Sequence, residues 1–120
     1  MRIRESAEDY LETILMLYET KGEVRSIDIA AEMGVTKPSV SVAMKKLRES
    51  GCIVMDKDNF ITLTDEGMRI AQKVFNRHKV ISRFLMQIGV NEEDAKNDAC
   101  KIEHDISPAT FEAILAQLKN

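Results

Sequence analysis

The chain is poor in residues that interrupt or cross-link a polypeptide, with only two prolines and two cysteines among 120 residues. No stretch is rich in proline, glycine and serine, so we expect no flexible linker. Two cysteines are too few for a disulfide framework and predict reduced thiols. No apolar run approaches the ~20 residues of a membrane span, and no apolar segment follows the N-terminal arginines as in a signal peptide. We therefore expect a cytoplasmic protein without a membrane partner, folded as one domain or two closely joined subdomains.

Positive charge is also scarce, because the formal net charge is −3, and this alone argues against a nucleic-acid partner. The charges are unevenly distributed, however. Residues 36–50, TKPSVSVAMKKLRES, hold four basic residues and one acidic residue, a local net charge of +3. Because contacts to phosphates are local, a basic helix within an acidic chain can still bind DNA.

The order of the predicted elements indicates the fold of the first part of the chain. Apolar periodicity and turn residues predict helices over 5–21, 27–33 and 36–50, then a hairpin of strands 52–55 and 60–63. Ser26 and Thr36 are the expected N-caps of the second and third helices, and Gly51 is expected to end the third.

This order is that of a winged helix-turn-helix, in which a small three-helix core presents the third helix to the DNA major groove and the hairpin flanks the backbone. An ordinary helical bundle with a solvated basic face is the alternative, but it does not explain a hairpin directly after the basic helix. Further helices are expected over 65–88, over 91–104 and from Ser107-Pro108 onward.

The segment CKIEHDIS combines three kinds of metal ligand. If 91–104 is a helix, Cys100, Glu103 and His104 are spaced i, i+3, i+4 and share one face. A surface helix normally has apolar residues at this spacing, whereas this face carries a thiol, a carboxylate and an imidazole. Cys100 taken alone is also compatible with a small apolar role in the core.

Two other places offer ligands, although each has a plainer explanation by itself. Asp9 and Glu12 lie i, i+3 on the first helix, where acids also suit the helix dipole. His78, one of only two histidines, is by itself better explained as a surface histidine. If the three helices pack together, the pooled oxygen, nitrogen and sulfur donors suit Fe²⁺, Mn²⁺, Co²⁺ or Zn²⁺.

Such a cluster of acids is the basis for a metal-dependent switch. Carboxylates brought together without a cation repel one another, and a divalent ion reverses the sign of that energy. We hypothesise that the first helix is loose without metal because Asp9 and Glu12 repel Glu103. Its packing would then depend on metal and would set the spacing of two recognition helices.

The sequence resembles the iron- and manganese-dependent repressor family typified by the diphtheria toxin repressor and the manganese transport regulator. The resemblance covers nearly the whole chain and rests on SAEDYLETI, the winged helix, LTDEG, the RH pair at 77–78, FLMQIGV and, above all, CKIEHDIS. It implies a homodimer that binds a divalent metal between its DNA-binding and dimerisation domains. The metal-bound dimer would bind operator DNA and repress metal-uptake genes.

What the resemblance implies is therefore a regulator and not an enzyme. Its cofactor would be Mn²⁺ or Fe²⁺, with Co²⁺ or Zn²⁺ as substitutes in vitro. Its partners would be double-stranded operator DNA and a second copy of the chain, with no small-molecule substrate. The predicted fold is mainly α, with a winged helix-turn-helix DNA-binding domain over 1–72 and an all-helical metal-binding and dimerisation domain over 73–120.

Carried over by position, the implied ligand set mixes two branches of the family. Asp9 matches the aspartate of the manganese-responsive branch, and Cys100 matches the cysteine of the iron-responsive branch. A hard carboxylate favours Mn²⁺ and a thiolate favours Fe²⁺, Co²⁺ or Zn²⁺, so both metals stay open. Glu12 could bridge two ions in a binuclear site. The implied ligands are Asp9, Glu12, His78, Cys100, Glu103 and His104.

The implied DNA contacts come from the positions matching Thr36, Pro38, Ser39 and Val42. Val42 replaces the glutamine of the toxin repressor, so its operator sequence is not transferred. Hydroxyl groups can bond phosphates or base edges, and the lysines, with Arg48, add charge where they face DNA. The predicted DNA-binding residues are Thr36, Lys37, Pro38, Ser39, Ser41, Val42, Lys45, Lys46 and the wing residue Lys57.

The apolar residues after position 76 have two explanations that we rate as equal, a dimer contact and an intramolecular core. They are Phe84, Leu85, Ile88, Phe111, Ile114 and Leu115. The chain has no counterpart of the C-terminal SH3-like domain of the iron-responsive members, so it is expected to be either a trimmed chain or a minimal regulator.

Two other functions remain as alternatives. One is a winged-helix transcription factor that responds to an organic ligand or an oxidant, with Cys100 as a low-pKa redox sensor near His104. The other is a metal-dependent hydrolase, which is disfavoured because the sequence has no glycine-rich phosphate loop and no nucleophile motif.

Overall fold

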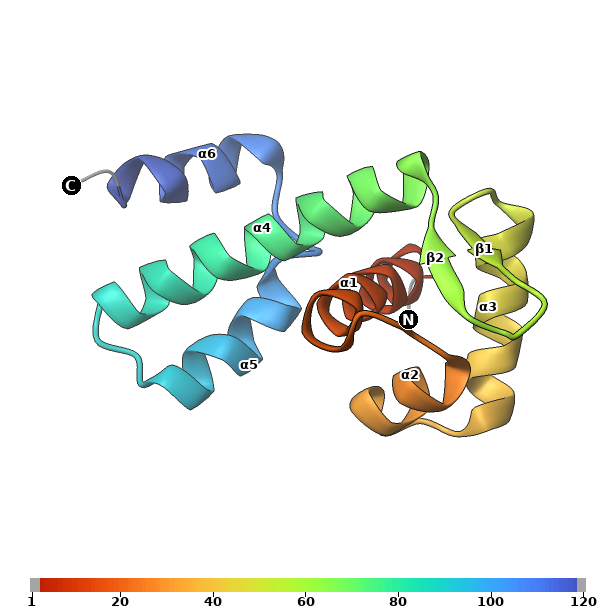
Figure 1. Cartoon of the computed structure of the whole chain (residues 1–120). Helices are drawn as coiled ribbons and strands as arrows, with labels where there is room; N and C mark the ends of the chain where they lie inside the picture. Colours follow the sequence, from red (N-terminus) through yellow and green to blue (C-terminus); the bar gives the residue numbers. More distant parts are fainter. Residues whose placement is uncertain (1–2, 119–120) are drawn as a thin grey trace. The chain divides into compact units, whose positions relative to one another are not determined.

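A computed structural model describes residues 3–118, and the side chains of residues 7–118. The chain divides into two compact units, Met1–Gln72 and Lys73–Asn120, which are described separately. The fold is mainly α, as predicted (Figure 1). Its elements are α1 (Ile3–Lys21), α2 (Ser26–Met33), α3 (Lys37–Glu49), β1 (Ile53–Met55), β2 (Ile61–Leu63), α4 (Asp65–Gln87), α5 (Glu92–Ile102) and α6 (Pro108–Gln117).

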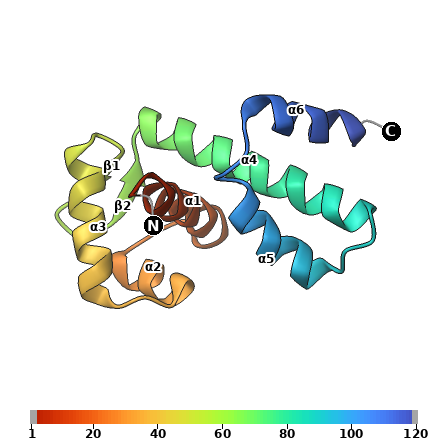
Figure 2. The same cartoon turned by 180° about the vertical axis from the view of Figure 1, so that it is seen from behind.

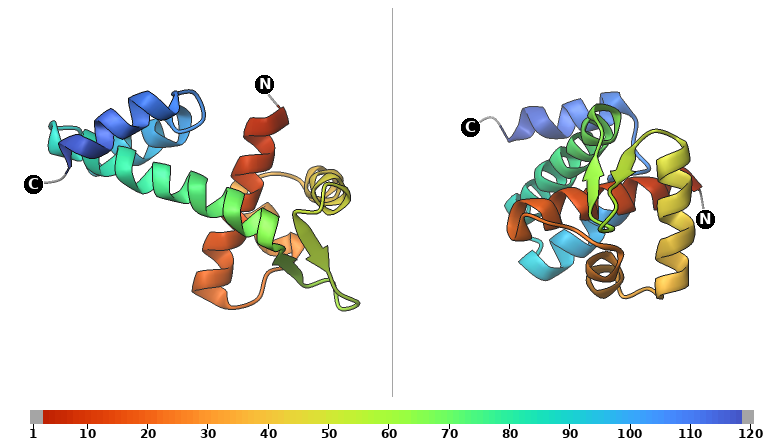
Figure 3. Two further views of the ribbon diagram at one scale, coloured as in Figure 1. Left: turned by 90° about the horizontal axis from the view of Figure 1, so that it is seen from above. Right: turned by 45° about the vertical axis from the view of Figure 1, so that its right-hand side comes forward.

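The first unit is a winged helix-turn-helix. Helices α1, α2 and α3 contact one another, and the hairpin contacts α1 and α3, as the right-hand view in Figure 3 shows for α3 and β1. The two strands pair antiparallel, with Ile53 opposite Leu63 and Met55 opposite Ile61. The largest fully buried side chains of the first unit are those of Leu11, Ile14, Val24, Ile29, Val40, Met44, Ile53 and Ile61.

The predicted N-cap of α3 is confirmed, whereas the predicted N-cap of α2 is wrong. Thr36 caps α3, because its Oγ1 accepts a hydrogen bond from the Ser39 backbone N–H at 3.3 Å. Ser26, in contrast, is the first residue of α2 and not its cap. The cap is Arg25, whose backbone N–H donates to Asp28 Oδ2 at 2.9 Å. The Asp28 carboxylate, at the third helical position, accepts from the backbone N–H of the cap residue, as in one half of a capping box, and this fixes the start of α2 one residue earlier than predicted.

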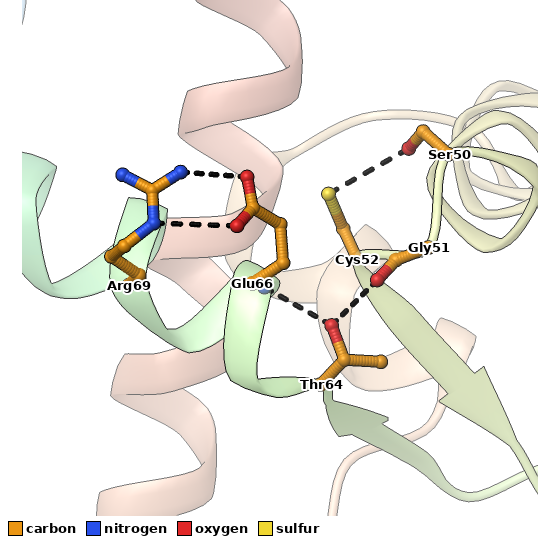
Figure 4. Close-up of polar contacts among 7 residues, drawn as sticks. Ser50, Gly51, Cys52, Thr64, Glu66 and Arg69 are labelled. Carbon is orange, nitrogen blue, oxygen red and sulfur yellow. Dashed lines mark hydrogen bonds and ion pairs between the residues drawn. The ribbon is translucent and has the colours of Figure 1, made fainter.

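The base of the hairpin is attached to the first turn of α4 (Figure 4). The Thr64 backbone N–H donates to the Cys52 carbonyl at 3.0 Å, and Thr64 Oγ1 donates to the Gly51 carbonyl at 2.6 Å. The same hydroxyl oxygen accepts from the Gly67 backbone N–H at 3.1 Å and so caps the helix. A Cβ at Gly67 would overlap the Cys52 carbonyl oxygen. The close approach of helix and strand therefore requires glycine.

The second unit consists of the later part of α4 with α5 and α6, which Figure 2 shows alongside it. Asn91 and Ser107 are the N-caps of α5 and α6, through side-chain oxygens that accept from the Asp94 and Thr110 backbone N–H groups. The core is formed by Val80, Ile81, Ala99 and Phe111, with Leu85, Ile102, Ile106, Ile114, Leu115 and Leu118 packed against it. Of the apolar residues with two explanations, Phe111 thus belongs to the intramolecular core, whereas Ile88 is 61% exposed.

The prediction that one helix continues to His104 is wrong. Helix α5 ends at Ile102, Glu103 is its C-cap, and His104 lies in the following turn. The Asp105 backbone N–H donates to the Ile102 carbonyl at 2.9 Å, which closes a tighter turn instead of extending the α-helix.

Among the described residues, no helix combines the length and the apolarity that crossing a membrane would demand.

Candidate metal centre and DNA-binding surface

Three potential ligands converge in the second unit at the end of α5. The Nδ1 atom of His78, on α4, lies 3.1 Å from Glu103 Oε2 and 3.7 Å from Cys100 Sγ. One ligand atom from each of the three residues lies within 4.8 Å of the others. Because Cys100 and Glu103 are one helical turn apart and His78 comes from another helix, the three donors surround a common point.

The carboxylate of Glu103 is the centre of this cluster. Its side chain has no exposed surface, and its Oε1 atom has no hydrogen-bond partner among the described residues. His104 Nε2 lies 3.5 Å from Oε1, close enough for an ion pair, without hydrogen-bond geometry. A buried carboxylate oxygen without a hydrogen bond is costly. A cation bound at this oxygen would remove that cost, so the donor set fits a metal ion.

The electrostatic environment of the cluster favours positive charge. The hydrogen bond with Cys100 and then that with Glu103 raise the pKa of His78 to about 10, against the opposing effect of burial. Without metal, the protonated His78 imidazole therefore supplies the positive charge beside the thiol and the carboxylate. A metal ion can take this place when the imidazole releases its proton.

The predicted ligands fall into two groups. His78, Cys100, Glu103 and His104 come together within the second unit, although His104 comes from the turn and not from the helix. Asp9 and Glu12 lie on α1 in the first unit, where Glu12 is 7% exposed.

The predicted DNA-binding residues of α3 share a solvent-facing surface. Val40, Met44 and Leu47 are buried against the first unit, whereas all the side chains between them except that of Ala43 are exposed, including Val42 at 57%. Thr36, at the cap, and Lys57, in the hairpin turn, are exposed too. The exposed residues of this surface are Thr36, Lys37, Pro38, Ser39, Ser41, Val42, Lys45, Lys46 and Lys57.

A concavity of about 460 Å³ adjoins this surface, and it contains a basic residue that the sequence reasoning missed. Its polar wall includes Arg25, Lys45 and Arg48, together with Ser41 and Asn59. The Arg25 guanidinium carbon lies 4.1 Å from the centre of the Phe60 ring. In the sequence, Arg25 is a single arginine between the first two helices. The basic residues of 36–50 are clustered, and only such a cluster predicted DNA binding.

Comparison with known proteins gives matches over both units. Residues 2–59 match the family described as iron dependent repressor, N-terminal DNA binding domain. Residues 64–120 match the iron dependent repressor, metal binding and dimerisation domain.

Individual relatives agree with these matches. The transcriptional regulator MntR of Salmonella typhimurium is 40% identical over 113 residues, which cover 94% of this chain and 72% of the relative. The HTH-type transcriptional regulator MntR of Geobacillus thermodenitrificans is 40% identical over 102 residues, covering 85% and 72%.

Solved structures show the same fold. A manganese-dependent transcriptional repressor in complex with manganese superposes with a TM-score of 0.86 at 30% identity, covering 93% of this chain and 52% of that one. The manganese regulator SloR gives 0.83 at 30% identity, covering 93% and 53%. The chain thus spans about half the length of these two proteins.

These matches confirm the predicted family and fold class, and they give no support to an organic effector or an oxidant. The family is one of transcriptional repressors and not of enzymes, in agreement with the prediction that this chain has no catalytic activity. The chain belongs to the iron-dependent repressor family, the metal-dependent, DNA-binding repressors of metal homeostasis.

Proposed function

We propose that this chain is a cytoplasmic, homodimeric repressor that binds operator DNA when Mn²⁺ or Fe²⁺ occupies a site centred on Glu103. The observation that carries the proposal is the buried Glu103 carboxylate, with one oxygen 3.1 Å from His78 and the other without a hydrogen bond. A purely structural glutamate at this place would be expected to have both oxygens satisfied.

The proposed ligands are His78, Cys100, Glu103 and His104, joined by Asp9 and Glu12. The first four supply nitrogen, sulfur and oxygen donors, the mixture that first-row transition metals accept. Asp9 and Glu12 are included on the strength of the sequence motif. A bound divalent ion would supply positive charge beside the buried carboxylate and the thiol.

The choice between the two metals depends on Asp9 and Cys100. An aspartate oxygen is a ligand that Mn²⁺ prefers, and a cysteine thiolate discriminates towards Fe²⁺, with Co²⁺ and Zn²⁺ as substitutes in vitro. Cys100 is exposed and free, so its thiol can be deprotonated by a metal without breaking a disulfide. Because Cys100→Glu replaces a sulfur donor with an oxygen donor, we expect it to shift the metal preference towards Mn²⁺.

Double-stranded operator DNA is the proposed partner of the first unit, whose α3 surface would lie in the major groove. The hydroxyl groups of Thr36, Ser39 and Ser41 supply donors for phosphates or base edges, while the exposed lysines supply charge. The concavity with Arg25 and Arg48 would receive a phosphate of the backbone. We propose a second copy of the chain as the other partner, so that the operator is roughly palindromic.

The proposal is tested by titrating the reduced protein with Mn²⁺, and anaerobically with Fe²⁺, in a calorimeter. In parallel, fluorescence anisotropy would follow binding to DNA from upstream of the protein's own gene, with and without chelator. We expect metal binding and a gain of 5- to 150-fold in DNA affinity, the range of an ordinary allosteric coupling. The stronger activator identifies the metal.

Two variants make the test specific. Glu103→Gln keeps the shape of the buried side chain but removes its charge, and we expect it to lose both metal binding and metal-dependent DNA binding. Glu112→Gln, on the exposed surface of α6, is the matched control and should behave as wild type. Chelator-insensitive DNA binding by the wild-type protein would overturn the proposal and bring forward an effector acting through Cys100.

A further inference from the structure

Arg77 holds the backbone of the same residue whose side chain pairs with His78. Its Nη1 atom donates to the Glu103 carbonyl at 3.0 Å and to the Ile106 carbonyl at 3.2 Å. His78, the next residue of α4, contacts the Glu103 carboxylate at 3.1 Å. Two consecutive residues of one helix therefore anchor Glu103, one by its main chain and one by its side chain.

The two carbonyls mark the ends of the turn between α5 and α6. Glu103 is the C-cap of α5, and Ile106 precedes Ser107, the N-cap of α6. Carbonyls at the end of a helix lack an intrahelical donor. The arginine supplies one for both ends of the turn, and so it bridges the segment that carries Glu103 and His104.

The same side chain also reaches α6. The Arg77 guanidinium carbon lies 5.3 Å from the centre of the Phe111 ring, a cation–π distance. Phe111 is 8% exposed and belongs to the core of the unit. The Arg77 guanidinium group therefore links α4 to the turn after α5 and to the buried face of α6.

We propose that Arg77 is a positioning residue for the metal site. It holds the turn over residues 103–106 in the conformation in which Glu103 and His104 present their ligand atoms, and it links that turn to α6. This inference rests on the proposed metal site and adds a residue that is not itself a ligand. Partners that orient metal ligands typically change metal affinity 10- to 100-fold when they are removed.

The test is a Mn²⁺ titration of Arg77→Met, Arg77→Lys and the matched control Arg83→Met, whose arginine lies exposed on the same helix. We expect Arg77→Met to bind Mn²⁺ about 10- to 100-fold more weakly than wild type, and Arg83→Met to bind as wild type does. Arg77→Lys keeps one donor charge but lacks the guanidinium fork, so it should recover only part of the loss.

Two further readouts separate positioning from general stability. Metal-free thermal unfolding identifies variants that are folded at the temperature of the titration. The absorption spectrum of bound Co²⁺ reports the Cys100 thiolate and the geometry around the ion, and we expect it to change in Arg77→Met but not in Arg83→Met.

The outcomes are distinct. Wild-type affinity and an unchanged Co²⁺ spectrum in Arg77→Met would overturn the positioning role. If Arg77→Met does not fold, the same result in Arg77→Lys would overturn it. A wild-type protein that binds no metal at all would overturn the proposed function itself, and the inference with it.

Discussion

Gly67 lies so close to the backbone carbonyl of Cys52 that a methyl group at position 67 would overlap the carbonyl oxygen. We expect Gly67→Ala to push the first turn of α4 away from the base of the hairpin. The cost should be about 2–4 kcal/mol of unfolding free energy, since the clash is with main chain that cannot rotate away. Urea unfolding measures it.

The control for this change is Glu66→Ala in the same helical turn. Within the part of the chain that the structure describes, Glu66 pairs with Arg69 across an exposed i, i+3 spacing, so its removal should leave the urea unfolding curve nearly unchanged. Equal unfolding curves for Gly67→Ala and wild type would show that the hairpin adjusts without strain.

The carboxylate of Asp28 links the end of α1 to the start of α2. Lys21 Nζ lies 2.7 Å from Oδ1, and the Arg25 backbone N–H donates to Oδ2 at 2.9 Å. The hydrogen bond from Lys21 and then the one from Arg25 lower the pKa of Asp28 below its ordinary value. We expect Asp28→Ala to cost about 1 kcal/mol at neutral pH, the usual value of a helix cap.

The sign of the pH dependence follows from the lowered pKa. The stabilisation is fully present above the unfolded-state pKa of about 4 and is lost as the pH falls through the lower folded-state pKa. Thermal unfolding of wild type and Asp28→Ala should therefore converge in acid. Asp98→Ala, exposed on α5, is the control for the loss of a surface carboxylate. A gap that widens in acid would contradict this assignment.

Removing metal should lower the thermal stability of the protein, by an amount that grows with the logarithm of the free metal concentration once the site is saturated. A ligand at 100 times its dissociation constant stabilises the folded state by about 2.7 kcal/mol. We expect Mn²⁺ to raise the melting temperature of wild type, and a chelator to reverse the rise. Glu103→Gln should not respond, whereas the control Glu93→Gln, exposed at the start of α5, should respond fully. A full response in Glu103→Gln would remove this carboxylate from the ligand set.

The basic residues around the concavity should contribute to DNA affinity mainly through charge. For Arg25→Ala and for Lys45→Ala, we expect weaker binding on all sequences and a salt slope reduced by about one unit for each lost phosphate contact. Anisotropy titrations at several salt concentrations measure both quantities. Lys101→Ala, exposed on α5, is the control with the same change in net charge. Salt slopes that match this control would place the concavity outside the DNA contact.

Among the residues of the second unit that the structure describes, Ile88 is the most exposed large apolar one. We expect Ile88→Lys to weaken the homodimer at least 10-fold, because a charge in an apolar contact must be desolvated. Sedimentation equilibrium measures the change. Metal-free stability should stay within about 0.5 kcal/mol of wild type, as is usual for exposed positions. An unchanged dimer would locate the contact elsewhere.

The fold was predictable wherever one residue determines a local structure. Thr36 followed by Pro38 defines the start of α3, and an apolar run on each side of Asp56–Asn59 defines the hairpin. Ser26 was predicted as the cap of α2 from its residue type, whereas the Asp28 carboxylate binds the backbone N–H of Arg25 and fixes the helix start one residue earlier. The end of α5 was missed because a single turn bond to the Ile102 carbonyl decides it.

The candidate site was predictable in its residue types but not in its support. Side-chain chemistry marked Cys100, Glu103 and His104, and helical periodicity placed the first two correctly on one turn. Arg77 could not be found in this way, because its partners are backbone carbonyls. Every residue has a carbonyl, so no sequence pattern identifies which ones an arginine will bind.

Val42 illustrates that a shared fold does not determine which DNA sequence is recognised. It is 57% exposed on the surface of α3 that we propose to face DNA, and its branched hydrocarbon can neither donate nor accept a hydrogen bond. Against a base edge, such a side chain senses the thymine methyl group and nothing of the polar pattern. If Val42 contacts a thymine in this way, replacing that thymine by uracil would leave base pairing unchanged and would weaken binding only through the lost methyl contact.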